Sequence, residues 1–203
     1  MHDEGYQDVI EYWFGPLDSS GFADHKRIKM WFMAGKKLDD EIKQKFGALV
    51  EQAVNGGLAQ WELKPTSLLA LIILLDQFTR NVYRGSAKAF AGDDRACRLA
   101  IDAINKGWDD LLGNSYCAFF YMPLEHSEDI KIQQCSVERF QRRYDQLSIE
   151  SQRRFKSFCN SAVEHCNIIE QFGRFPHRNN VMGRSSTTTE LTYLTGDAPR
   201  FGQ

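Results

Sequence analysis

Arginine, histidine and carboxylate side chains gather in three short segments of the sequence. The first polar segment is DQFTRNVYR (residues 76–84), the second is PLEHSEDIKIQQ (123–134), and the third is GRFPHRNNVMGRSSTTTE (173–190). Arginine donates paired hydrogen bonds to carboxylates and phosphates, and histidine exchanges protons near neutral pH. These residue types predict either the binding of an anionic group or acid–base chemistry.

Each polar segment is expected at the end of a helix, and helix ends on one side of a bundle can converge. We therefore predict that the three segments form one site. The predicted ligand-binding residues are Asp76, Gln77, Arg80, Asn81, Arg84, Arg174, Arg178, Asn179 and Arg184. The predicted catalytic residues are Glu125, His126, Glu128 and His177. In a catalytic scheme a histidine carries the proton, a glutamate orients it, and the arginines hold substrate oxyanions.

The charges of these segments leave two interpretations open. Their five arginines (80, 84, 174, 178 and 184) exceed by one the four acids Asp76, Glu125, Glu128 and Asp129. Uncompensated arginine would leave a pocket for a small anion, whereas full internal pairing would lock the third segment against the bundle with no ligand. In either case we expect Arg174 and Arg178 to pair with the acids between positions 125 and 129.

No metal and no cofactor is expected. His126 and Glu128, together with Glu164 and His165, have suitable donor types, but their spacing is neither HExxH nor a repeated Glu-x-x-His. Neighbouring residues on a helix point about 100° apart, which disfavours Glu125 and His126 as joint ligands. His165 lies on an apolar stripe and is expected to be a core histidine bonded to a neighbour. The glycine motifs of dinucleotide sites, P-loops and hydrolase elbows are absent from the sequence.

Hydrophobic residues recur at helical spacing along most of the chain. Residues 38–53 form one such face and stop at an Asn-Gly-Gly turn, and further helices are expected from Asp93, from Ser127 and from about Ser151 to Phe172. The segment from Pro65 to Leu75 is apolar on every side, so it belongs in the centre of the fold. Thr187 and Glu190 match a capping box for a last short helix. We predict one all-α domain over residues 1–203, a bundle of roughly seven to nine helices.

Composition narrows the classes of function. A net charge of −2 and 42% hydrophobic residues describe an ordinary globular chain and disfavour a nucleic-acid partner. The longest apolar run has eight residues, LLALIILL, where a membrane span needs about 20. The N-terminus lacks the pattern of a signal peptide, and the five cysteines include no CxxC pair. We therefore expect a cytoplasmic protein that does not enter a membrane.

Four motifs in order carry a resemblance to a known family. They are EYWFG, LALIILLDQFTRNVYRG, YMPLEHSED and FGRFPHRNNVMGRSST, and the likeness extends from about Val9 to Leu194. The chain resembles the bacterial domain-of-unknown-function 924 family. This resemblance implies an all-α fold similar to the helical hairpins of tetratricopeptide repeats, with no established biochemical function. Lys131 and Ile132 depart from the expected pattern, which weakens any ligand contact beyond Asp129.

The leading functional prediction is a polar Arg/His/Glu site that binds a small anionic molecule or the acidic end of a chain, such as an acidic peptide. One alternative is a cofactor-independent acid–base enzyme, a hydrolase or an isomerase. Another is a protein-interaction scaffold whose charge network is purely structural. The sequence leaves the oligomeric state open.

Overall fold

Helices and loops make up the whole of the computed structural model, which describes residues 5–32 and 35–196 and contains no strand in these ranges. Its α-helices are α1 (Gly5–Phe14), α2 (His25–Phe32), α3 (Lys36–Val54), α4 (Pro65–Ile72), α5 (Thr79–Val82), α6 (Asp93–Asn105), α7 (Asn114–Glu125), α8 (Ile130–Asp145), α9 (Ile149–Phe172) and α10 (Thr188–Thr195). A π-helical turn, η2 (Ile73–Phe78), joins α4 to α5. Short 3-10 turns are η1 (Ala59–Leu63), η3 (Ala87–Phe90), η4 (Asp109–Leu111) and η5 (Pro176–Arg178).

The central element is the continuous helical segment formed by α4, η2 and α5. It begins with Pro65 at its first position, where the missing N–H costs nothing. Every side chain from Leu68 to Leu75 is at most 2% exposed. The prediction that this apolar segment occupies the centre of the fold is confirmed.

The π turn η2 lies where the central helix changes from apolar to polar residues. A π turn holds more residues than an α-turn, so the residues that follow it are rotated about the helix axis relative to a regular helix. Asp76 lies inside this turn and is fully buried. The amino-acid pattern did not predict the π turn, which is a feature found frequently at functional sites.

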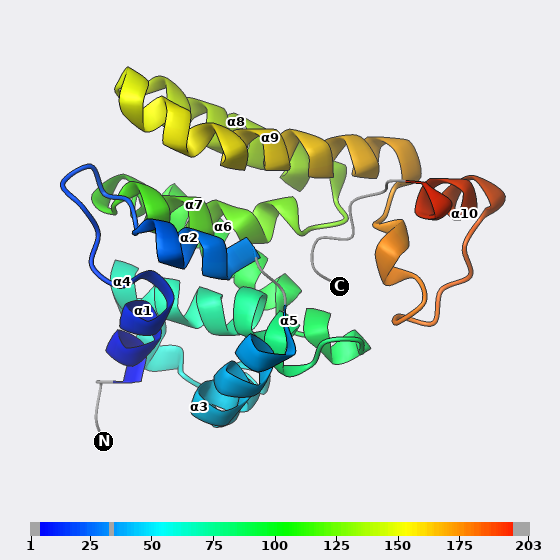
Figure 1. Ribbon diagram of the computed structural model, residues 1–203, viewed down its shortest axis with the longest axis horizontal. Coiled ribbons are helices and arrows are strands. Elements are labelled where there is room, and N and C mark those ends of the chain that lie inside the picture. Colours follow the sequence, from blue (N-terminus) through cyan, green and yellow to red (C-terminus); the bar gives the residue numbers. More distant parts are fainter. Residues whose placement is uncertain (1–4, 33–34, 197–203) are drawn as a thin grey trace.

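The other helices pack around this segment (Figure 1). The long helices α8 and α9 run antiparallel and form one outer layer, and α7 lies between this pair and the central helix. Phe140 of α8 and Phe155 of α9 are completely buried where the two layers meet. Helices α1 and α3 cover the opposite side, where Trp13 contacts Phe78 edge to face.

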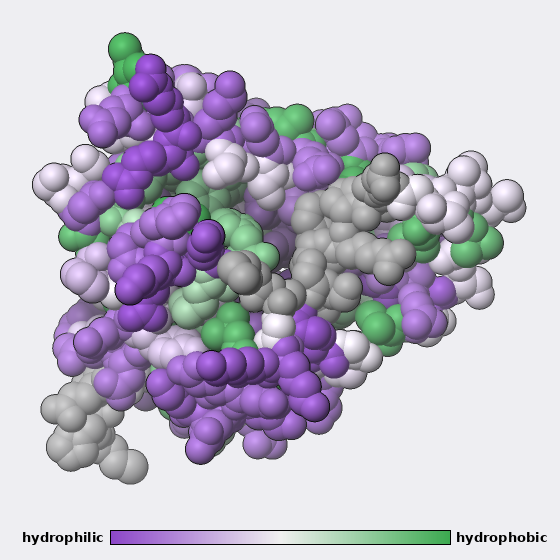
Figure 2. Space-filling view, viewed as in Figure 1, coloured by the Kyte–Doolittle hydropathy of each residue, from purple (hydrophilic) through white to green (hydrophobic). Residues whose placement is uncertain are grey.

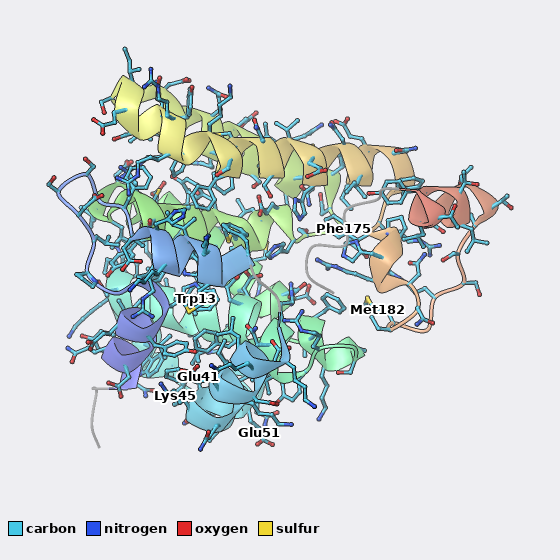
Figure 3. The ribbon with its side chains drawn as sticks, in the orientation of Figure 1. Trp13, Glu41, Lys45, Glu51, Phe175 and Met182 are labelled. Carbon is cyan, nitrogen blue, oxygen red and sulfur yellow. The ribbon has the colours of Figure 1, made fainter. Side chains whose placement is uncertain are left out.

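The third polar segment (residues 173–190) and α10 form a separate lobe at one end of the bundle (Figure 1). Gly173 ends α9 in the left-handed conformation, with φ of 69°, which glycine adopts without strain. Phe175 then packs with Ile168 and Ile169 in a small second hydrophobic cluster. Figure 3 shows Phe175 below the end of α9 and Met182 farther along the loop. The predicted capping box of Thr187 and Glu190 is confirmed.

The all-α prediction is confirmed, and nine separate α-helical segments in the described residues fall within the expected range when α4 and α5 are taken as one. The tetratricopeptide-like stacking and the single domain stay predictions. Helix α8 begins later than expected, because Asp129 rather than Ser127 caps it. None of the described helices has both the length and the apolar character that crossing a bilayer requires. On the face in Figure 2, hydrophobic residues form only small separate patches.

Candidate functional site

The first and second polar segments meet through Asp76 and His126. Nδ1 of His126, at the C-terminal cap of α7, lies 2.6 Å from Oδ1 of Asp76. Gln77 donates to the other carboxylate oxygen at 2.6 Å. Burial alone would raise the pKa of Asp76, but His126 and Arg80 outweigh it and hold this pKa at about 2. Asp76 is therefore a buried carboxylate that orients the imidazole of His126.

Asp93, the first residue of α6, joins the first segment to the third. Its carboxylate accepts two hydrogen bonds from Arg80, at 2.7 and 3.0 Å, and one from Nη1 of Arg178 at 3.2 Å. Arg80 also donates to the carbonyl oxygen of Ala89 and lies 3.7 Å from Asp76. The half-buried guanidinium of Arg80 and the buried guanidinium of Arg178 thus share one carboxylate, and Arg178 has the weaker share.

Arg178 is enclosed by aromatic rings and poorly compensated. Its guanidinium carbon lies 4.6 Å from the ring centre of Phe90 and 4.4 Å from that of Phe175, and the residue is 6% exposed. Nε has no hydrogen-bond partner among the described residues. Burial and the neighbouring Arg80 charge lower the pKa of Arg178 to about 10. A guanidinium with a lowered pKa has an environment that opposes its charge, so an added anion would stabilise it.

Glu128 fastens the third segment to the second. Its carboxylate receives two hydrogen bonds from Arg184, at 2.6 and 2.9 Å, and one from the backbone N–H of Phe175 at 2.8 Å. Burial raises the pKa of Glu128, but these three donors outweigh it and lower the pKa below its usual value. Glu128 is therefore an ionised anchor of the loop, and its oxygens are already engaged.

Glu125 and His165 lie behind His126. Glu125 is 3% exposed, and its Oε2 has no hydrogen-bond partner in the part of the chain that the structure describes. Burial, reinforced by the charge of Asp76, raises the pKa of Glu125 well above its usual value. Nδ1 of His165, on α9, lies 2.8 Å from the carbonyl oxygen of Ser161. Burial lowers the pKa of His165 to about 3, so this histidine is neutral at physiological pH.

A pocket of about 370 Å³ opens beside these groups; we call it the site pocket. Its charged and titratable lining residues are Asp93, Asp94, Cys97, Arg98, His126, Glu128 and Arg178. Its other lining residues are Phe90, Ile101, Pro123, Ser127, Ile132 and Met182. This volume is at the lower end of the range of small-molecule sites, and the mixed lining offers both charged and apolar contacts.

Several predicted site residues lie away from this pocket. Asn81 and Arg84 both donate to Asp39 of α3, so they belong to a separate contact. Arg174 donates to both oxygens of Glu190 on α10, at 2.6 and 2.8 Å. The expectation that Arg174 and Arg178 pair with acids between positions 125 and 129 is therefore wrong. Arg174 pairs with Glu190 and Arg178 pairs with Asp93. Arg184 is the arginine that pairs with an acid between positions 125 and 129, namely Glu128.

The remaining predicted residues of the third segment stabilise the loop. Asn179 is 1% exposed and donates to Ser186 at 3.0 Å. His177 contacts the ring of Phe175, with the two ring centres 5.5 Å apart, and lines a second pocket of about 590 Å³ with Arg184. Burial and the charge of Arg178 lower the pKa of His177 to about 3. His177 therefore stays neutral at neutral pH and is a poorer proton carrier than predicted.

Comparison with known proteins places this chain in a family. The model of the family described as "Bacterial protein of unknown function (DUF924)" matches residues 9–197. The chain belongs to the DUF924 family. A solved structure of a protein of unknown function from Agrobacterium tumefaciens is similar to it, with 31% sequence identity and a TM-score of 0.78. The match covers 95% of this chain and 99% of that chain. No relative was found among the curated proteins.

The residue pattern does not identify three acids that pair with the predicted arginines, and of these only Asp93 lines the site pocket. In the sequence Asp93 marks only a helix start, and Asp39 and Glu190 are not among the four acids expected at the site. At the heart of the site, three arginines (80, 178 and 184) face the three carboxylates of Asp76, Asp93 and Glu128. Among these six residues the arginines and the carboxylates are equal in number, so the predicted surplus of arginine is not found here. What remains is the uneven sharing of Asp93, which leaves Arg178 poorly compensated.

Proposed function

We propose that this DUF924 protein binds a small organic molecule with one anionic group in the site pocket. The observation that carries the proposal is Arg178, a buried guanidinium with one 3.2 Å contact to a shared carboxylate and a lowered pKa. A ligand carboxylate or phosphate would supply the missing acceptor. Charge-assisted hydrogen bonds of this kind are roughly twice as strong as neutral ones.

The lining of the pocket favours a ligand of low charge. Asp93, Asp94 and Glu128 line the same pocket as Arg178, so a polyphosphate would meet like charges. Phe90, Ile101 and Ile132 provide apolar surface for the rest of the molecule. We therefore expect a monocarboxylate or monophosphate with an apolar body rather than a nucleotide or a long acidic peptide.

A thermal-shift titration tests this proposal. The protein, freed of any metal with a chelator, is titrated with propionate, benzoate and phenyl phosphate. Pyrophosphate is the polyanion used for comparison. A ligand at 100 times its Kd stabilises the folded state by about 2.7 kcal/mol, which raises Tm by about 5–10 °C in a chain of this size. Arg178→Gln should abolish the shift. Arg84→Gln, which alters the separate contact with Asp39, should preserve it.

An absence of any shift in the wild-type protein, or equal shifts in wild type and Arg178→Gln, would contradict the proposal. A larger shift with pyrophosphate than with the monoanions would contradict the low-charge preference. The first of these results would favour the purely structural network, in which the arginines serve only to fasten the third segment.

An acid–base enzyme is the second candidate, and the 2.6 Å contact between Asp76 and His126 favours it. A carboxylate that holds an imidazole at a pocket wall is the arrangement that general-base catalysis uses. In this case His126→Gln would retain binding of an identified ligand and lose its turnover. Equal turnover in His126→Gln and wild type would exclude His126 as the proton carrier.

A further inference from the structure

Three potential metal ligands lie together behind the site pocket. Glu125 and His126 come from the end of α7, and His165 comes from α9, forty residues away in sequence. One donor atom from each residue lies within 4.8 Å of the others. On a tetrahedral Zn²⁺ ion with bonds of roughly 2.1 Å, donor atoms are about 3.4 Å apart. The cluster is therefore close to the required spacing, and side-chain rotation can close the difference.

Both histidines are oriented from behind as metal-binding histidines are. Nδ1 of His165 contacts the carbonyl oxygen of Ser161, which can only accept a hydrogen bond, so Nδ1 carries the proton. Nδ1 of His126 lies against the Asp76 carboxylate in the same way. Each ring therefore presents the lone pair of Nε2. Histidines that bind metals almost always donate their other N–H to a carboxylate or a backbone carbonyl.

The third potential ligand is the buried carboxyl group of Glu125, which is hydrogen-bonded to the side chain of Ser161. Glu125 is 3% exposed, and Oε2 has no hydrogen-bond partner among the residues that the structure describes. Buried polar atoms without a partner are uncommon and call for an explanation such as an ion or a functional role. A cation between Glu125 and the two imidazoles would provide it.

We propose that Glu125, His126 and His165 bind one divalent transition-metal ion, with Zn²⁺ as the best match. Two imidazoles and one carboxylate are the ligands of a well-known class of catalytic zinc sites. Fe²⁺ is the main competitor, because non-haem iron sites use the same three groups. Sequence spacing does not reveal the cluster, because two of its residues come from the end of α7 and the third comes from α9.

This inference goes beyond the proposed anion pocket and gives His126 a different role from the acid–base candidate. His126 belongs both to the cluster and to the pocket lining, so a bound ion would lie next to the pocket. Three protein ligands leave a position on a tetrahedral ion for water or a ligand atom. An anion in the pocket could then be held by Arg178 and by the ion together.

Metal titration of the wild-type chain tests the inference. The protein is freed of metal with a chelator, dialysed, and titrated with Zn²⁺ by calorimetry and with Co²⁺ by visible absorption. We expect one ion per chain, and tetrahedral Co²⁺ bands near one equivalent. X-ray absorption of the zinc-loaded protein should show nitrogen and oxygen ligands including two imidazoles. A failure to bind stoichiometric Zn²⁺, or a sulfur-dominated shell, would overturn the inference.

Matched variants locate the ion. Glu125→Gln and His165→Gln preserve side-chain volume approximately and should weaken Zn²⁺ binding by more than about 100-fold. Asp76 is not a proposed ligand but orients the His126 imidazole, so Asp76→Asn should weaken Zn²⁺ binding by about 10- to 100-fold. His177→Gln lies outside the cluster and should bind as the wild type does. Equal affinity in wild type, Glu125→Gln and His165→Gln would show that the ion binds elsewhere, and circular dichroism confirms that each variant is folded.

The metal inference and the anion proposal can fail separately. Anion binding is measured in the chelated protein, and metal binding is measured without the anion. Arg178→Gln should leave one Zn²⁺ site per chain in place, because Arg178 is not a ligand. Loss of stoichiometric Zn²⁺ binding in folded Arg178→Gln would contradict the assignment of the ligands.

Discussion

Replacing Asp93 by asparagine removes the charge that Arg80 and Arg178 share. The carboxylate accepts three hydrogen bonds, two from Arg80 and one from Arg178. The side chains of Arg80, Arg178 and Asp93 are 13%, 8% and 14% exposed, so water screens them poorly. Asparagine has one acceptor oxygen, and its amide group would face a guanidinium.

We expect Asp93→Asn to lower the free energy of unfolding by about 3–5 kcal/mol, the usual cost of removing one partner of a buried charge pair. For a chain of this size the melting temperature would fall by about 6–20 °C. Urea denaturation at pH 7, followed by circular dichroism, measures the loss. Asp94→Asn is the matched control, because Asp94 is exposed in the first turn of the same helix, and its cost should stay below about 1 kcal/mol.

We also expect Asp93→Asn to change ligand binding, because in the proposed site the Asp93 carboxylate competes with an anionic ligand for Arg178. Sodium propionate should stabilise Asp93→Asn more than it stabilises the wild-type protein, since an added carboxylate replaces the missing charge. Sodium chloride at equal ionic strength separates this effect from screening. A stability loss no larger than that of Asp94→Asn would refute the shared-carboxylate reasoning. Equal propionate effects in both proteins would refute the competition for Arg178.

Two further predictions concern the elements around the site. Gly92→Ala should lower the free energy of unfolding, measured in urea, by more than about 2 kcal/mol, because the new methyl group would overlap the carbonyl oxygen of Leu75. Gly47→Ala, with room on the surface of α3, should instead raise it by about 0.5–1 kcal/mol. Equal effects of the two substitutions would contradict the close approach of Gly92 to Leu75. Arg174 holds the pKa of Glu190 at about 2 instead of 4.5, so this stabilisation is complete above pH 4.5 and is lost as the pH falls toward 2. Glu190→Gln should therefore flatten the fall of Tm between pH 4.5 and 2, and an unchanged slope would show that the pair contributes nothing.

The helices could be predicted from the sequence because their signals are local. Apolar spacing gave the extent of α3 and the central position of residues 68–75, and Gly173 gave the end of α9. The capping box at Thr187 is likewise a contact between residues three apart. The π turn η2 left no comparable signal, because its sequence, ILLDQF, contains neither a glycine nor a proline to interrupt the helical pattern.

The pairing within the site depends on packing and could not be read from the sequence. Asp93 and Asp94 are adjacent in the first turn of α6, yet only Asp93 faces Arg80 and Arg178. Glu190 was predicted to cap α10 and does so, but its carboxylate also accepts from Arg174. Gathering titratable residues by segment selected segments that contact one another in the fold, whereas the choice of partner is decided by which helices touch.

The local environment of Arg178 likewise follows from tertiary structure. Phe90 and Phe175 enclose it from segments 85 residues apart, and neither aromatic residue belonged to the predicted site. Their contact excludes water from the guanidinium and makes its charge costly. His165 is buried and bonded to Ser161, as expected of a core histidine, and the same packing brings it to Glu125 and His126 as a potential ligand.

The most direct test of an anion site at Arg178 is to observe its Nε–H group by ¹⁵N NMR during a titration with benzoate. The signal is assigned by its loss in Arg178→Lys. The account predicts a saturable downfield shift of this proton as the carboxylate becomes its hydrogen-bond acceptor, with the Arg84 signal unchanged. A signal from Arg178 that stays fixed while benzoate is added, up to concentrations that perturb other arginines, would contradict the central claim.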